Sequence, residues 1–199
     1  REKYQDLLDL HIPVCKSFGT DQGFEVVRVG IQVLGGVGFT KGFPLEQNAR
    51  DQKIASIYEG TNGIQALDLV GRKFNTKKGQ LLDVLVDELS WFDHNSPDGE
   101  LAGWVAEWET YRTLMLESIA CLKKTGEAEG KDGYLLYAVN MLDLMGDVLC
   151  CFYLLKQAES AQNKWKSMLD GSASQAELLE DNEEAQFYWN KLRTTEFYV

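Results

Sequence analysis

Proline is scarce in this sequence of 199 residues, with three in the whole chain. Long helices are therefore favoured, because proline interrupts them. No apolar run approaches the ~20 residues that a membrane-spanning helix needs. Basic residues are also few: 20 Lys and Arg stand against 31 Asp and Glu, which gives a formal net charge of −11. Such a balance repels phosphate backbones and anionic membranes, so we expect neither nucleic acid nor a membrane as a partner.

Cysteine and histidine are too sparse for a disulfide framework or a metal cluster. The four cysteines are Cys15, Cys121, Cys150 and Cys151, and no two of them form a C-x-x-C pair. Reduced thiols in a cytoplasmic protein are the favoured interpretation. His11 and Cys15 lie four positions apart and could share one helix face. No third or fourth ligand lies near them in the sequence, so we predict no metal site.

What the sequence does contain is helical periodicity. Hydrophobic residues make up 44% and charged residues 26%, as in ordinary globular proteins. Apolar residues recur at helical spacing, and no useful length alternates as a β-strand would. We therefore predict an all-α fold, an antiparallel helical bundle followed by further helices. The pattern changes style after the polar connection at residues 75–79, so we expect two parts, residues 1–75 and 76–199.

Turns and capping residues place the expected helices. In the first part we expect helices over residues 3–18, from a cap at Thr20 and Asp21 to Leu34, from Pro44 to Lys53, and after a cap at Thr61. In the second part we expect apolar stripes over residues 81–92 and 101–122, a polar turn over 125–133, a long helix over 134–161, a polar acidic stretch over 170–184 and a last helix around 185–192. Tyr111 belongs to the apolar stripe over 101–122, and Tyr137 is among the core candidates of the helix over 134–161.

The unusual segment is Gln32–Arg72. Its Gly35-Gly36-x-Gly38 loop does not have the G-x-G-x-x-G spacing of a dinucleotide-binding turn. The loop is either a helix end or a place where a ligand such as a pyrophosphate approaches the backbone closely. Glu59 precedes Gly60 and the helix that Thr61 caps. On chemistry alone this carboxylate is either a helix-end acid or a base next to polarising N–H groups.

Several motifs in this segment occur together and in order. They are the run 32–39 (QVLGGVGF), the run 44–47 (PLEQ), Arg50-Asp51, and the run 57–69 (IYEGTNGIQALDL). Together they closely resemble the C-terminal helical domain of acyl-CoA dehydrogenases, over about residues 1–75. The rest of the chain is similar in length and helical character to the extension of the larger bacterial members.

The resemblance implies an FAD-dependent oxidation of an acyl-CoA thioester to the trans-2-enoyl-CoA. Glu59 matches the catalytic glutamate that removes the α-proton, and Gly60 matches a substrate-binding position. Arg50 matches a position that orders the site. The residues that match flavin contacts are Gln32, Val33, Leu34, Gly35 and Gly36, in a loop usually supplied by the neighbouring subunit, together with Thr61 and Asn62.

The resemblance also implies partners and a longer parent protein. It implies an acyl-CoA substrate, electron-transferring flavoprotein as electron acceptor, and a homo-oligomer, either a dimer or a tetramer. The family's N-terminal helical domain and β domain are not represented in this sequence, so we expect a C-terminal portion that is inactive alone. Two alternatives stay open, a non-catalytic helical module for oligomerisation or binding and an acyl-CoA oxidase. The intact Glu59 favours an enzyme.

Overall fold

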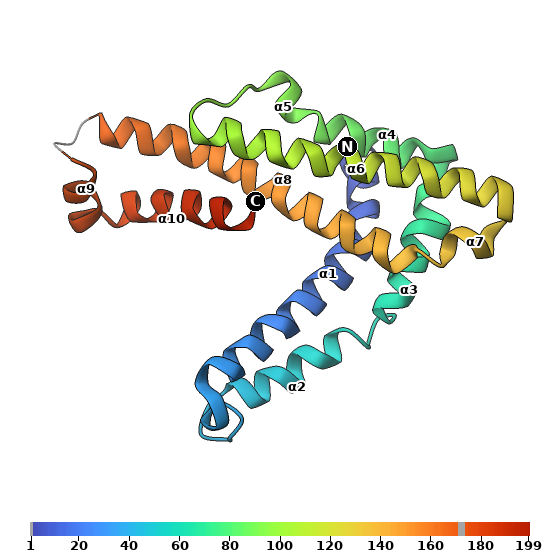
Figure 1. The fold of residues 1–199 in the computed structure, drawn as a ribbon, viewed down its shortest axis with the longest axis horizontal. Helices are drawn as coiled ribbons and strands as arrows, with labels where there is room; N and C mark the ends of the chain where they lie inside the picture. Colours follow the sequence, from blue (N-terminus) through green and yellow to red (C-terminus); the bar gives the residue numbers. More distant parts are fainter. Residues whose placement is uncertain (1, 171–173) are drawn as a thin grey trace. The chain divides into compact units, whose positions relative to one another are not determined.

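The computed structural model describes residues 2–170 and 174–199. Within those ranges the chain is built from helices with no β-strand, so the all-α prediction is confirmed (Figure 1). The helices form two compact units. The first comprises the chain up to Asp87 with Glu117–Gly146, and the second comprises Glu88–Leu116 with Asp147–Val199. The division predicted at residue 75 concerns sequence character rather than compactness, and it stays a prediction.

The first unit opens with a helical hairpin. Helix α1 (Glu2–Leu34) is followed by the short 3-10 turn η1 (Gly35–Val37) and by α2 (Leu45–Ala55), and α1 and α2 lie side by side (Figure 1). We predicted two helices where α1 is one, and that prediction is wrong. The hydroxyl of Thr20 donates to the carbonyl oxygen of Ser17 one turn earlier, at 3.0 Å, so Thr20 does not cap a new helix.

The hairpin leads into a run of short helical turns. They are α3 (Asn62–Leu67), the π-helical turn η2 (Asp68–Arg72), η3 (Lys73–Gly79) and α4 (Gln80–Leu89). The predicted connection is confirmed, because Thr76, Lys77 and Lys78 leave helical geometry inside η3. Lys77 and Lys78 adopt left-handed φ values of 49° and 59°.

Two long helices contribute to both units. After α5 (Trp91–His94), helix α6 (Glu100–Glu129) is followed by α7 (Lys131–Leu135) and by α8 (Ala138–Leu169). The predicted turn over residues 125–133 is too long, because the break is at Gly130, with φ 81°. Gly126 lies inside α6 and is needed for packing: a Cβ there would lie 2.8 Å from Cδ1 of Tyr134.

The second unit ends with α9 (Gln175–Asp181) and α10 (Glu183–Tyr198). Helix α9 lies in the acidic stretch that we expected to precede the last helix. The core of this unit centres on Trp108. Its ring stacks on that of Phe152 with the ring centroids 5.3 Å apart, and its Nε1 donates to the carbonyl oxygen of Val148 at 3.0 Å. Tyr137 was a core candidate but is 57% exposed, so that prediction is wrong; Tyr111, a member of the apolar stripe over 101–122, is 49% exposed.

Among the described helices, α8 is the one long and apolar enough to cross a membrane. Of its most apolar 18-residue window, 56% is buried inside the structure. Its residues Met145, Phe152 and Leu155 are fully buried. Packing therefore accounts for the apolar composition of this helix, as it does for the core helix of any helical protein.

Candidate functional site

The turn that carries Glu59 has an unusual backbone. Glu59 adopts a left-handed φ of 55° and Gly60 one of 84°. Glycine takes this conformation freely, whereas for a glutamate it is uncommon. Thr61 then caps α3, because its Oγ1 accepts from the backbone N–H of Ile64 at 3.4 Å. The predicted cap is confirmed, and Glu59 lies two residues before it.

Side chains from two helices hold this turn in place. The carbonyl oxygen of Glu59 accepts a hydrogen bond from Nε2 of Gln65 in α3, at 2.9 Å. The carbonyl oxygen of Gly60 accepts from Nζ of Lys16 in α1, at 2.6 Å. Both peptide oxygens around the left-handed pair are therefore fixed.

Asn62 connects the same turn to α1. Its Oδ1 accepts from Nζ of Lys16 at 2.8 Å, and its Nδ2 donates to Oγ1 of Thr20 at 3.1 Å and to the carbonyl oxygen of Ser17 at 3.3 Å. Its backbone N–H donates to the carbonyl oxygen of Ser56 at 3.3 Å. The structure thus places the Asn62 side chain against α1.

The Glu59 side chain is exposed, and so are the apolar residues beside it. Ile57, Tyr58 and Ile64 are between 52% and 56% exposed. A carboxylate becomes a stronger base when apolar surroundings remove its water. Within the described residues the turn offers apolar neighbours on an open surface, and a further covering surface is needed to desolvate Glu59.

The segment Gln32–Gly36 lies at the other end of the hairpin. All five residues are exposed, and Val33 is 79% exposed. Lys16 and Thr20 mark where α1 meets the Glu59 turn. Gln32 lies twelve positions after Thr20 on the same helix, a rise of about 18 Å at 1.5 Å per residue. One copy of the chain therefore does not bring the two groups of predicted flavin contacts together.

The glycines near the predicted flavin contacts differ in whether the structure requires a glycine at their position. Gly35 has a φ of 63°, and a Cβ on Gly38 would lie 2.7 Å from Cβ of Leu34. Gly36 and Gly63 have neither constraint: their φ is not left-handed, and no atom lies within 4 Å of where a Cβ would be. These two positions leave the backbone open to close approach by another molecule.

Arg50 and His11, two residues considered from the sequence, each interact within their own helix. Arg50 is exposed on α2 and pairs with Glu46 one turn earlier on the same helix. Nδ1 of His11 lies 2.6 Å from the carbonyl oxygen of Leu7, within its own helix. In the part of the chain that the structure describes, no group of three or more His, Cys, Asp or Glu is placed to hold a metal ion.

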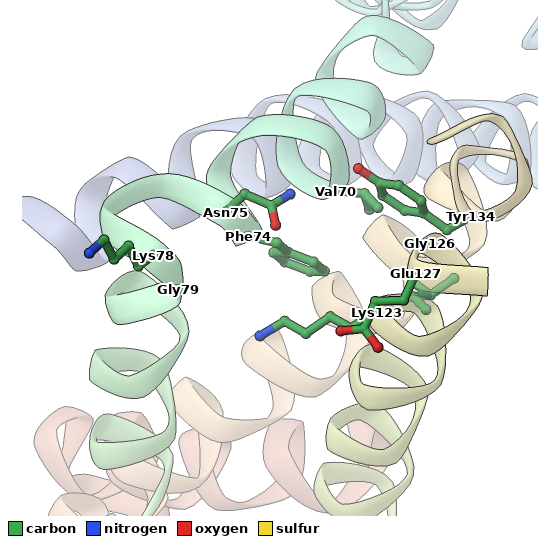
Figure 2. Close-up of a pocket in the computed structure, with 10 residues that line it drawn as sticks. Val70, Phe74, Asn75, Lys78, Gly79, Lys123, Gly126, Glu127 and Tyr134 are labelled. Atoms are coloured by element: carbon green, nitrogen blue, oxygen red, sulfur yellow. The ribbon is translucent and has the colours of Figure 1, made fainter. Parts of the chain in front are cut away.

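A separate pocket of about 440 Å³ lies in the first unit. Figure 2 shows the Asn75 amide and the Lys123 ammonium directed toward its interior beside the Phe74 ring. Val70 and Tyr134 also line it. The lining includes none of the residues predicted for the site, and the pocket is open with exposed polar groups, so we assign it no function.

Sequence reasoning missed Lys16, Thr20 and Gln65 as residues of the site. A weak signal was available: Lys16 and Thr20 are four positions apart, so they share one helix face, and Lys16 is the one lysine or arginine between Lys3 and Arg28. Nothing in the sequence shows that this face meets residues 60–62, because those residues are more than forty positions away.

Comparisons with known proteins cover nearly the whole chain. Residues 2–73 match the family described as "Acyl-CoA dehydrogenase, C-terminal domain", and residues 85–199 match that described as "Acetyl-CoA dehydrogenase C-terminal like". A butyryl-CoA dehydrogenase of Syntrophomonas wolfei is 34% identical over the full chain, which covers 31% of that protein.

Other relatives align over similar shares. A broad-specificity linear acyl-CoA dehydrogenase of Mycobacterium tuberculosis is 31% identical over 96% of this chain and 30% of its own length. A 3-methylmercaptopropionyl-CoA dehydrogenase of Ruegeria pomeroyi is 28% identical over all of this chain and 32% of its own length. The chain spans about a third of the length of these relatives. It therefore belongs to the acyl-CoA dehydrogenase family, of which it represents the C-terminal portion.

Proposed function

We propose that this chain is the C-terminal portion of an FAD-dependent enzyme that converts an acyl-CoA thioester to the trans-2-enoyl-CoA, with Glu59 as the base that removes the α-proton. The observation that carries this proposal is the Glu59 turn. The turn presents a carboxylate outward from a backbone that two side chains hold. A base must be held in this way to abstract a proton from a bound substrate.

The residues on the surface fit a flavin cofactor shared between two copies of the chain. Gln32–Gly36 and the Thr61 turn lie about 18 Å apart along α1, so we assign them to two flavin sites, each completed by the other copy. The open backbone at Gly36 and Gly63 suits close contact with such a ligand. When bound, FAD would accept the hydride from the substrate's β-carbon.

Individual residues then have distinct roles in this proposal. Glu59 accepts the α-proton, and Gly60 lets the substrate lie close to the backbone. Thr61 contacts the flavin at the start of α3. Asn62 contributes mainly by tying the turn to α1, because its side-chain amide is already bonded there. Arg50 orders α2 through its ion pair with Glu46.

The partners follow from the same proposal. The substrate class is acyl-CoA thioesters, the electron acceptor is electron-transferring flavoprotein, the assembly is a dimer or tetramer and the location is the cytoplasm. The names of the relatives specify a short, a broad linear and a sulfur-containing acyl group. The acyl group accepted therefore varies among these relatives. For this chain we propose acyl-CoA thioesters as the substrate class and no particular acyl group.

The test is Glu59→Gln in the full-length parent enzyme. The amide has nearly the same shape but cannot accept the proton, so turnover should fall at least ~10²-fold while flavin stays bound. Glu180→Gln, an exposed glutamate on α9, is the matched control and should leave turnover unchanged. Activity of Glu59→Gln above about one per cent of wild type would place the base elsewhere.

A further inference from the structure

We infer that Lys16 is a positioning residue for Glu59, acting through the backbone of the turn. This inference rests on the proposed function, because it assigns to Lys16 the task of aiming the catalytic carboxylate. Lys16 lies on α1, 43 positions before Glu59 in the sequence. Its ammonium reaches the turn from α1, whereas the other side chain that holds the turn, Gln65, belongs to α3.

The ammonium of Lys16 donates two short hydrogen bonds to the turn. Nζ lies 2.6 Å from the carbonyl oxygen of Gly60 and 2.8 Å from Oδ1 of Asn62. Hydrogen bonds from a charged donor are shorter and stronger than neutral ones. Lys16 is half-buried, so competition from water at these bonds is reduced.

Both acceptors are neutral, and this decides what Lys16 does. Its ammonium is bonded to the peptide oxygen after Gly60 and to the Asn62 amide, while the Glu59 side chain is exposed on the surface. Lys16 therefore orders the main chain next to Glu59. A lysine that formed an ion pair with the carboxylate would instead compete for the group that must take the proton.

Ordering is needed because the turn is conformationally demanding. Glu59 and Gly60 are consecutive left-handed residues, and glycine has more accessible conformations than any other residue. Gln65 fixes the peptide oxygen before Gly60, and Lys16 fixes the one after it. Without Lys16, Gly60 can rotate and the direction of the Glu59 side chain spreads over a wider range.

The experiment uses the full-length flavin-loaded enzyme with Lys16→Met, which keeps the apolar stem and removes the charge. We expect kcat to fall about ten- to a hundredfold, the loss expected for a charged hydrogen bond. KM for the acyl-CoA should change by less than about threefold and bound flavin should be unchanged. Lys16→Arg retains donors and should recover most of the lost turnover.

Hydrogen exchange supplies a readout that is independent of activity. Backbone amides in the peptide spanning residues 57–62 should exchange about tenfold faster in Lys16→Met, with other peptides unchanged. Lys124→Met is the matched control, an exposed lysine on α6, and should leave exchange and kcat at wild-type values. If Lys16→Met does not fold, Lys16→Gln replaces it, since glutamine removes the charge but keeps an amide donor.

Two results would overturn the inference. If Glu59→Gln inactivates the enzyme but Lys16→Met keeps turnover within about twofold of wild type, the role assigned to Lys16 is refuted. The proposed function is then unaffected. Parallel loss of flavin, thermal stability and kcat, with faster exchange throughout the first unit, would show a structural role. An active Glu59→Gln enzyme would instead refute the proposed function.

Discussion

Replacing Trp108 with alanine tests the packing of the second unit. Trp108 is 1% exposed, stacks on Phe152 and meets the edge of Phe92 at 5.9 Å. A buried tryptophan removes about 200 Å² from water, worth about 5 kcal/mol at 25 cal/mol per Å² as an upper estimate. The Nε1 bond to the Val148 carbonyl contributes about 1 kcal/mol more, and the methyl group of alanine retains part of the burial.

We therefore expect Trp108→Ala to lower the free energy of unfolding by about 3–5 kcal/mol. For a chain of this size that is a fall of roughly 6–20 °C in the unfolding temperature, measured by circular dichroism on the purified chain. Trp108→Phe keeps an aromatic ring and should cost less. Phe197→Ala is the control, since Phe197 in α10 is 93% exposed and its removal should cost no more than about 0.5 kcal/mol. A loss below about 1 kcal/mol for Trp108→Ala would show that this residue is not in the core.

Three further predictions address other parts of the chain. In the first unit the Phe18 ring occupies the space where a Cβ on Gly146 would lie, so Gly146→Ala should destabilise by about 1–3 kcal/mol in thermal unfolding, and adding Phe18→Leu should restore part of that loss. Burial raises the pKa of the Cys151 thiol to about 12. As the pH rises, the unfolded chain therefore releases this proton before the folded chain does. The free energy of unfolding should fall by about 1.4 kcal/mol per pH unit above about pH 8.5. This slope should be smaller in Cys151→Ala and should keep its wild-type value in Cys121→Ala, the control at an exposed cysteine. The isolated chain should be helical but colourless as a monomer, because one copy holds its two flavin-contacting segments about 18 Å apart; stoichiometric FAD absorbance in the monomer peak of a sizing column would contradict this.

Much of the architecture follows from local chemistry, and the sequence was sufficient to predict it. Apolar spacing predicted the helices, the Thr61 hydroxyl predicted the cap of α3, and the polar run at 75–79 predicted a connection. The failures also have local causes. Thr20 resembles a cap in sequence but bonds within α1, and Gly126 resembles a turn residue but makes room for the Tyr134 ring. A glycine or threonine has several uses, and its tertiary neighbours decide among them.

Some features of the candidate site also follow from the sequence, and others follow only from the tertiary structure. The sequence by itself determined which carboxylate stands before the capped helix, because Glu59, Gly60 and Thr61 are adjacent. Only the tertiary structure decided what holds that carboxylate, since Lys16 meets Gly60 across 44 positions of chain. Only the tertiary structure placed Gln32–Gly36 at the far end of the hairpin. Such distances depend on how α1 packs against α2 and α3, which no local pattern of residues records.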